Sequence, residues 1–176
     1  MSTATTPITG TWTIDAVHSS VGFSVKHIVS RFRAGFEQVE GSFDADAGVL
    51  VGRAPVESID VTQPDFRGHL LSPDFFDVAN HPTIDFVSRE LTLSPDGTAT
   101  ATGELTLLGV TKPVVATGEY TETTEGPAGT IFGLELEAKV DRHDFGLSWN
   151  MEAPGGRKVV GDEVTITVSL ELLQQA

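Results

Sequence analysis

The sequence contains no cysteine, which excludes disulfides and every catalytic or metal site that requires a thiolate. It also lacks any run near the roughly 18 consecutive apolar residues that a transmembrane helix needs. The N-terminal segment MSTATTPITG has neither the basic region nor the apolar region of a secretory signal peptide. We therefore expect a cytoplasmic protein, with a disordered lead-in over residues 1–10 and a single domain over residues 11–176.

Positive charge is scarce: 11 Lys and Arg stand against 25 Asp and Glu, and the formal net charge is −14. Nucleic acids and anionic membrane surfaces would repel such a chain, and the scattered cations form no basic patch in the sequence. We expect no nucleic-acid partner and at most transient membrane contact. The excess of acid is most simply explained by solubility.

Signatures of catalysis and metal binding are absent or weak. No pair of histidines has the helical spacing of an HExxH metal site, no GxSxG elbow occurs, and Gly155–Gly156 is a flexible turn rather than a phosphate-binding loop. His18, Ser19 and Ser20 beside Asp15 suggest a triad, but these four residues lie in one short stretch, and Asp15 and Ser19 are better explained as partners of turn backbone. We expect no metal, no cofactor and no enzymatic activity.

What is present is a repeated alternation of apolar and polar residues, which indicates half-buried strands. In the first strand Val21, Phe23 and Val25 share one face. Strands are expected over residues 11–27 with a bend at 16–18, then over about 33–44, 49–60, 83–93, 98–107, 114–123, 132–140 and 164–172. Eight amphipathic strands with short turns predict an all-β antiparallel barrel, and a two-sheet sandwich is the alternative.

Three local features qualify this pattern. Residues 28–32 fit a helical turn, and Pro55 inside a strand indicates an edge or a bulge. Residues 61–81, with Pro82 directly after them, combine three prolines with an apolar series of helical spacing, which predicts one or two short helices on a long connection. Such a connection acts either as a lid or plug, or as an ordinary end cap.

Small residues at inward positions favour a hollow barrel. They are Gly52, Ala54, Ala99, Ala101, Gly103, Ala116 and Gly118. Such positions leave volume that a ligand must fill, or that some of the 10 phenylalanines must fill from opposite strands. Few charges fall on the inferred inner face, so we expect an apolar guest, and we expect Phe at position 101 or 103 to block the tunnel while sparing the fold.

A barrel rim is predicted where Arg142 and Asp144 end an apolar strand and are followed by Phe145, Leu147 and Trp149. Two interpretations are open: a salt bridge that closes the rim, or a contact to the head group of a ligand at the mouth.

A set of motifs appears in order along nearly the whole chain. They are Trp12-x-x-Asp15-x-x-His18-Ser19-x-Val21-x-Phe23-x-Val25-Lys26-His27, Phe75-Phe76-Asp77, Pro82-x-Ile84-x-Phe86-x-Ser88, Gly103-x-Leu105-Thr106-Leu107, Gly109-Val110-Thr111-Lys112-Pro113-Val114, Arg142-x-Asp144-Phe145-Gly146 and Gly161-Asp162-x-Val164-x-Ile166. In these motifs the chain resembles the YceI-like family of polyisoprenoid-binding proteins.

The resemblance implies a lipocalin-like eight-stranded barrel, often dimeric, that holds an isoprenoid, an isoprenoid quinone or another long-chain amphiphile in a tunnel. The implied function is binding, storage or transport. The chain departs from the family by lacking a signal peptide and by carrying Leu108 where a histidine commonly precedes the GVT motif. The second departure bears on the preferred head group.

The candidate ligand-binding residues are Phe23, Val25, His27, Phe36, Phe43, Ile84, Phe86, Leu105, Leu107, Phe132, Leu134, Leu136, Phe145, Trp149 and Val168, with Phe75 and Phe76 as a gate at the entrance. Two rivals remain. One is a lipid isomerase or hydrolase with His27 or His18 as the base, and the other is a filled barrel that serves as a stress or interaction module.

Overall fold

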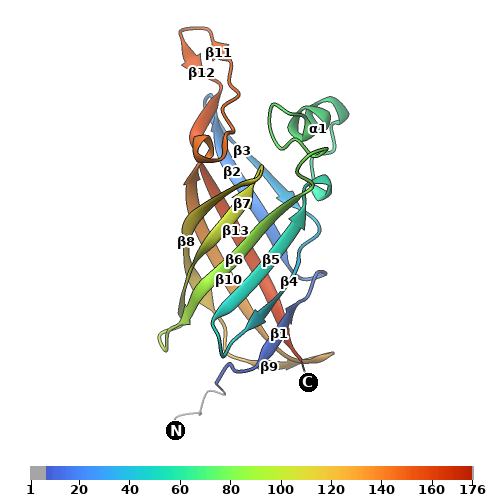
Figure 1. Cartoon of the computed structure of the whole chain (residues 1–176), viewed down its shortest axis with the longest axis vertical. Helices are drawn as coiled ribbons and strands as arrows, with labels where there is room; N and C mark the ends of the chain where they lie inside the picture. Colours follow the sequence, from blue (N-terminus) through green and yellow to red (C-terminus); the bar gives the residue numbers. More distant parts are fainter. Residues whose placement is uncertain (1–6, 176) are drawn as a thin grey trace.

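A computed structural model describes residues 7–175 of the chain, and strands dominate it (Figure 1). The strands of the main sheet are β1 (Thr11–Ile14), β2 (Ser20–His27), β3 (Ser30–Phe36), β4 (Glu40–Asp44), β5 (Val49–Pro55), β6 (Thr83–Leu93), β7 (Thr98–Leu107), β8 (Val110–Tyr120), β9 (Thr124–Gly126), β10 (Gly129–Asp141) and β13 (Val160–Gln174). The other elements are the helix α1 (Pro64–Leu71), two 3-10 turns (Val56–Ser58 and Arg142–Phe145) and a small hairpin of β11 (Glu152–Ala153) and β12 (Arg157–Lys158).

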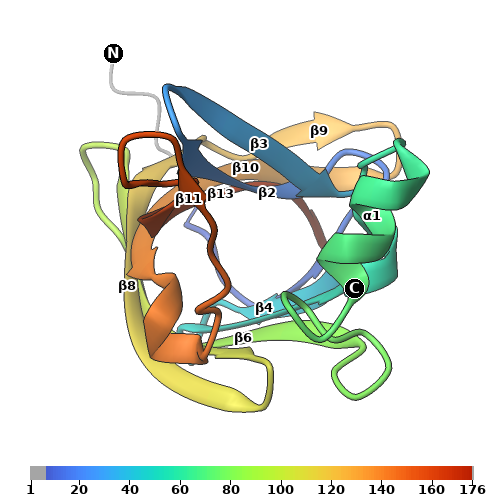
Figure 2. The ribbon, with the colours of Figure 1, turned by 90° about the horizontal axis from the view of Figure 1, so that it is seen from above.

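The main sheet closes on itself through β13. One edge of β13 pairs with β10, and the other pairs first with β2 and then with β1. The pairs β1/β2 and β3/β4 each act as one interrupted strand, so eight strands complete the ring that is seen down the barrel in Figure 2. This confirms the predicted antiparallel barrel and the bend in its first strand, and it excludes the sandwich.

One of two local predictions was wrong. Residues 28–32 form no helical turn: His27 pairs with Ser30, so Ile28 and Val29 are a two-residue hairpin turn in which Ile28 adopts a φ of 49°. The predicted edge position of Pro55 is confirmed locally: β4 pairs with β5 only as far as Arg53, so Pro55, the last residue of β5, pairs with Thr83 of β6 on one side alone.

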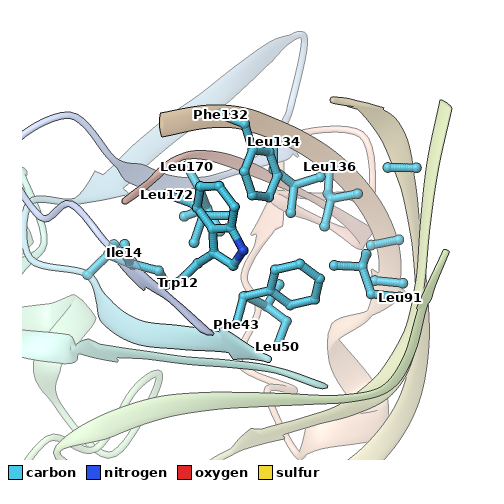
Figure 3. Packing of buried hydrophobic residues seen from close by; sticks show 14 residues of the cluster. Trp12, Ile14, Phe43, Leu50, Leu91, Phe132, Leu134, Leu136, Leu170 and Leu172 are labelled. Atoms are coloured by element: carbon cyan, nitrogen blue, oxygen red, sulfur yellow. The ribbon is translucent and has the colours of Figure 1, made fainter. Parts of the chain in front are cut away.

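One end of the barrel is closed by a cluster that we call the plug: Trp12, Phe43, Phe132, Leu134 and Leu172, all almost fully buried (Figure 3). The rings of Trp12 and Phe132 pack edge to face, with centroids 4.8 Å apart. The Trp12 Nε1 donates to the Thr9 carbonyl oxygen at 3.0 Å, and Ile8 packs on the same cluster. These contacts involve the end of the expected lead-in, whereas residues 1–6 lie outside the described residues.

The helix α1 lies at the opposite end, as predicted for the 61–81 connection (Figure 1). The outer edge of β3 meets the chain before this helix through the Phe36–Ile59 bridge and through two bonds between Gly35 and Asp60. Below the helix, Phe36, Val56, Leu70 and Phe76 form a second buried cluster. Within residues 7–175, no helix has both the length and the apolar character needed to cross a bilayer.

Candidate functional site

The interior of the barrel holds a cavity of about 660 Å³ between the plug and the end that carries α1. We call that end the mouth; it is bordered by α1, the β2–β3 turn and the segment that follows Arg142 (Figure 2). The cavity excludes the alternative in which side chains fill the barrel completely. Most of its lining is aliphatic or aromatic.

Alternation along the strands supplies this lining, because every second side chain of a barrel strand points inward. The predicted residues that line the cavity are Phe23, Val25, His27, Phe36, Phe75, Phe76, Ile84, Phe86, Leu105, Leu107, Leu136, Phe145, Trp149 and Val168. The prediction omitted inward residues that share the same alternation, among them Val114, Ala138, Val140, Val164 and Ile166. The alternation of inward and outward residues along each strand, visible in the sequence, was the signal that would have identified them.

Phe43, Phe132 and Leu134 point inward as predicted, but the structure places them in the plug and not in the cavity lining. All three lie near the closed end of their strands, where Trp12 fills the barrel. Alternation identifies the inner face of a strand and contains no information about height along the barrel axis, so it could not separate plug from cavity.

The small inward residues divide into three groups. Gly52, Ala54 and Ala116 line the cavity and do leave space there, whereas Ala99 and Ala101 pack in the core of the closed end. A Cβ at Gly103 would lie 2.2 Å from the Val87 carbonyl oxygen, and one at Gly118 would lie 1.8 Å from the Glu135 carbonyl oxygen. These two glycines permit close backbone approach. The predicted blocking substitutions at 101 and 103 therefore target the wrong positions.

Three aromatic rings meet across part of the mouth. The imidazole of His69 on α1 packs against the ring of Trp149 at 4.8 Å and that of Phe75 at 5.0 Å, and Phe75 and Trp149 are 5.2 Å apart. Phe75 thus lies at the entrance as predicted. Phe76 instead packs into the wall against Phe23 and Phe36, with ring centroids 5.9 Å apart in both contacts.

Arg142 is buried at the rim and forms no salt bridge with any residue of the described range 7–175, contrary to the predicted salt bridge that would close the rim. Its Nε donates to the Gly161 carbonyl oxygen at 2.7 Å, and its Nη1 donates to those of Leu147 and Trp149 at 2.5 and 2.9 Å. Burial lowers the pKa of Arg142, and the negative charges of Asp162 and Asp141 oppose this. The sequence could not reveal these partners, since a carbonyl oxygen is available at every residue.

Asp15, His18 and Ser19 lie outside the cavity lining. The Asp15 Oδ1 accepts from the backbone N–H of Val17 at 2.9 Å, and the Ser19 Oγ accepts from that of Glu171 at 3.0 Å. The prediction that Asp15 and Ser19 bind backbone is confirmed, whereas the His18 ring contacts the carboxylates of Asp15 at 2.9 Å and Glu171 at 3.3 Å. Of the two histidines considered as a base, His27 lines the cavity and His18 does not.

A closed eight-stranded antiparallel barrel with one plugged end and one open mouth defines a lipocalin-like protein. The family model of the YceI-like domain matches residues 12–172. The chain therefore belongs to the YceI-like family.

Relatives and solved structures agree with this assignment. A UPF0312 protein of Azotobacter vinelandii is 30% identical over 165 residues, covering 90% of this chain and 83% of the relative. The fold is similar to that of BcnA from Burkholderia cenocepacia (TM-score 0.70, 21% identity, covering 90% of this chain and 98% of that one). It is also similar to that of a polyisoprenoid binding domain from Saccharophagus degradans (TM-score 0.72, 13% identity, covering 93% and 98%).

Proposed function

We propose that this protein binds a single long-chain amphiphile, an isoprenoid or a lipid of similar shape, and stores or transports it. The apolar tail lies in the cavity and the head group lies at the mouth. The observation that carries the proposal is the cavity of about 660 Å³, apolar, plugged at one end and open at the other. The name of the Saccharophagus degradans neighbour, a polyisoprenoid binding domain, supports the isoprenoid class.

The cavity volume bounds the size of the tail. At the ~30 Å³ that a water molecule occupies in the liquid, the cavity has room for roughly 20 heavy atoms. Burying a tail of that size is worth on the order of 15 kcal/mol at about 0.8 kcal/mol per methylene. The cost of association and of ordering the tail offsets much of this gain. Tails of about 16 to 20 carbons fit best, and a longer isoprenoid would extend beyond the mouth.

The identity of the ligand is accessible by native mass spectrometry of protein purified from its own host without detergent, followed by extraction into organic solvent. We expect a mass increment that one amphiphile per chain explains. Protein that carries nothing and that also fails to take up geranylgeraniol would contradict the proposal.

Adjacent residues of β5 offer a matched test of where the tail lies. An added Cβ at Gly52 meets nothing within 4 Å, and Gly52 lines the cavity, whereas its neighbour Val51 is 40% exposed and lies outside the lining. Gly52→Phe should weaken geranylgeraniol binding at least tenfold, measured by fluorescence of Trp149, and Val51→Phe should leave it unchanged. Equal affinities in two variants that melt like the parent would show that the tail lies elsewhere.

A further inference from the structure

Two hairpin tips lie next to each other at the end of the molecule that carries the mouth (Figure 1). They are the β2–β3 turn with its flanks, residues 26–31, and the segment that contains the β11–β12 hairpin, residues 151–159. The Ile28 N–H donates to the Val159 carbonyl oxygen at 3.0 Å, and β2 pairs with β13 directly beside this bond. The two tips therefore form one surface, which we call the tip patch.

Exposed apolar side chains occupy both tips. Val29 is 81% exposed and Met151 is 57% exposed. A two-residue hairpin turn usually holds Gly, Asn or Asp where its backbone needs a positive φ, yet Ile28 has this position with a φ of 49°, which β-branched residues rarely adopt. Met151 also lines the cavity, so the exposed apolar surface continues into the barrel. Such side chains gain free energy when a partner removes them from water.

The tip patch is basic, in contrast to the chain as a whole. Its only carboxylate is that of Glu152, whereas four exposed side chains carry positive charge: Lys26, Arg31, Arg157 and Lys158. Strand alternation turns Lys26 and Arg31 to the outer face of the barrel, where they pair directly opposite each other and repel. Within residues 7–175 none of the four forms an ion pair, and Arg31 donates only to the neutral Ser24 Oγ, at 3.2 Å. An anionic surface would relieve this repulsion.

Carboxylates near the tip patch have other partners or lie across the mouth. Lys158 is among the charges that lower the pKa of Asp162, but the Asp162 carboxylate contacts the His143 ring at 2.8 Å. Asp65 and Asp74 belong to the connection that carries α1, which lies on the other side of the mouth (Figure 2). These acids therefore leave the four cations of the patch without a bound counter-charge.

The net charge of −14 does not prevent an anionic surface from meeting the tip patch. Much of the acid lies in turns at the plugged end, for example Asp44, Asp46 and Asp96. A strand of 13 residues, such as β10, is roughly 43 Å long at 3.3 Å per residue, so even when tilted it separates the two ends by about 30 Å. Screening acts over about 8 Å at physiological salt, so the local cations determine the potential beside the patch.

We infer that the tip patch docks this barrel on a lipid bilayer that contains anionic lipids, with Val29 and Met151 inserted among the head groups. Apolar side chains flanked by Lys and Arg are typical of segments that lie in the bilayer interface. The mouth then opens beside the membrane, and an apolar tail can enter the cavity with little exposure to water. The inference goes beyond the proposed function, because it concerns the outer surface and holds for the barrel with or without a ligand.

Vesicle binding by the full chain tests the inference. Vesicles of phosphatidylcholine with about 30% phosphatidylglycerol are compared with vesicles of phosphatidylcholine alone by co-sedimentation at 0.05 M NaCl. We expect at least tenfold tighter binding to the anionic vesicles, and we expect 0.5 M NaCl to reduce this advantage. Equal affinities, or no binding to either, would overturn the inference. Binding of geranylgeraniol is measured without vesicles, so the proposed function would still stand.

Two exposed valines offer a matched test of orientation. Val17 is 85% exposed, as Val29 nearly is, but it lies at the bend between β1 and β2, next to Asp15 in space. Anionic vesicles that contain a brominated lipid should quench the added fluorescence of Val29→Trp and leave that of Val17→Trp unchanged, each compared with the parent. Equal quenching of the two would show that the tip patch does not face the bilayer, and would overturn the inference.

Two pairs of substitutions with the same change in charge locate the electrostatic part. Lys26→Gln with Arg31→Gln should weaken binding to the anionic vesicles about 10- to 30-fold. Arg89→Gln with Lys139→Gln, on β6 and β10 outside the patch, should have little effect. Equal losses would show that net charge alone controls binding and would refute the patch. Duplex DNA is the other polyanion to test, and binding to it as tight as to the vesicles would overturn a bilayer as the partner.

Discussion

Single residues show how closely the barrel backbone is packed. Gly103 of β7 pairs with Ser88 of β6. The register between the two strands shifts directly after this pair, between Ser88 and Glu90. An added Cβ at Gly103 would lie 2.6 Å from the Ser88 Cα as well as 2.2 Å from the Val87 carbonyl oxygen. No side chain fits there without a shift of the backbone, which explains the glycine.

Gly103→Ala should therefore lower the free energy of unfolding by about 3 kcal/mol or more, because it forces two strands apart. Gly68→Ala is the control, since Gly68 lies in α1 with open space around it, and alanine there should stabilise by about 0.5–1 kcal/mol. Urea denaturation of both variants measures the two effects. Similar stabilities of the two proteins would contradict the close-approach role.

The ionic contact of His18 predicts a dependence of stability on pH. The hydrogen bond from His18 to Asp15, at 2.9 Å, is the main cause that lowers the pKa of Asp15 to about 2 and raises the pKa of His18. The contribution of Asp15 is lost as pH falls through about 2. The stabilising contribution of His18 is complete below the ordinary histidine pKa of 6.5. It is lost as the pH rises through the raised pKa that His18 has in the folded protein.

His18→Gln should accordingly lower the urea midpoint at pH 5 and have a smaller effect at pH 9. Chemical denaturation at the two pH values, with His81→Gln as a control, measures the difference. A loss that is the same at both pH values would show that the ring contributes by packing and not by charge.

At the scale of elements, one side chain organises the rim. Arg142 directly follows β10 and begins a 3-10 turn, and its guanidinium binds the carbonyl oxygens of Leu147, Trp149 and Gly161. Asn150 adds a second link, donating to the Val160 carbonyl oxygen at 2.8 Å. These bonds hold the segment that carries Trp149 over the mouth, in contact with His69 and Phe75.

Arg142→Lys should release this segment, because an ammonium group cannot replace a planar fork that reaches three carbonyl oxygens. We expect a loss of about 2–4 kcal/mol in the free energy of unfolding and new proteolytic cleavage between residues 147 and 158. Arg157→Lys, in the exposed β11–β12 hairpin, is the control and should change neither. A protein that resists protease as the parent does would disprove the organising role.

At the scale of the whole molecule, the barrel is divided into a packed half and a hollow half. The plug gives the closed end a core around Trp12 (Figure 3). The wall of the cavity, including Phe86, faces open volume instead. Removal of a side chain should therefore be far more costly in the plug than in the wall, since only the plug loses contacts on all sides.

Trp12→Ala should lower the free energy of unfolding by about 3–5 kcal/mol and the Tm by about 10 °C. Phe86→Ala, which enlarges a cavity that already exists, should cost less than half as much. Calorimetry of the two variants compares the halves directly. Equal losses would show that the cavity wall is packed as densely as the plug.

The sequence by itself determined most of the strands, their inner faces and a short helix within residues 61–81. It could do so because strand periodicity and turn residues are local properties that each segment shows alone. It predicted an antiparallel barrel but left a two-sheet sandwich open, because closure depends on pairing between distant strands. The same periodicity placed Phe86 and Val168 on the cavity wall correctly.

Only the tertiary structure decided height along the barrel, and with it which inward residues form the plug and which line the cavity. It also decided that Gly103 serves close approach and that Arg142 binds carbonyl oxygens. Each of these depends on the register between strands and on contacts between distant segments. Such contacts arise only when the barrel closes, so no single segment of the sequence contains them.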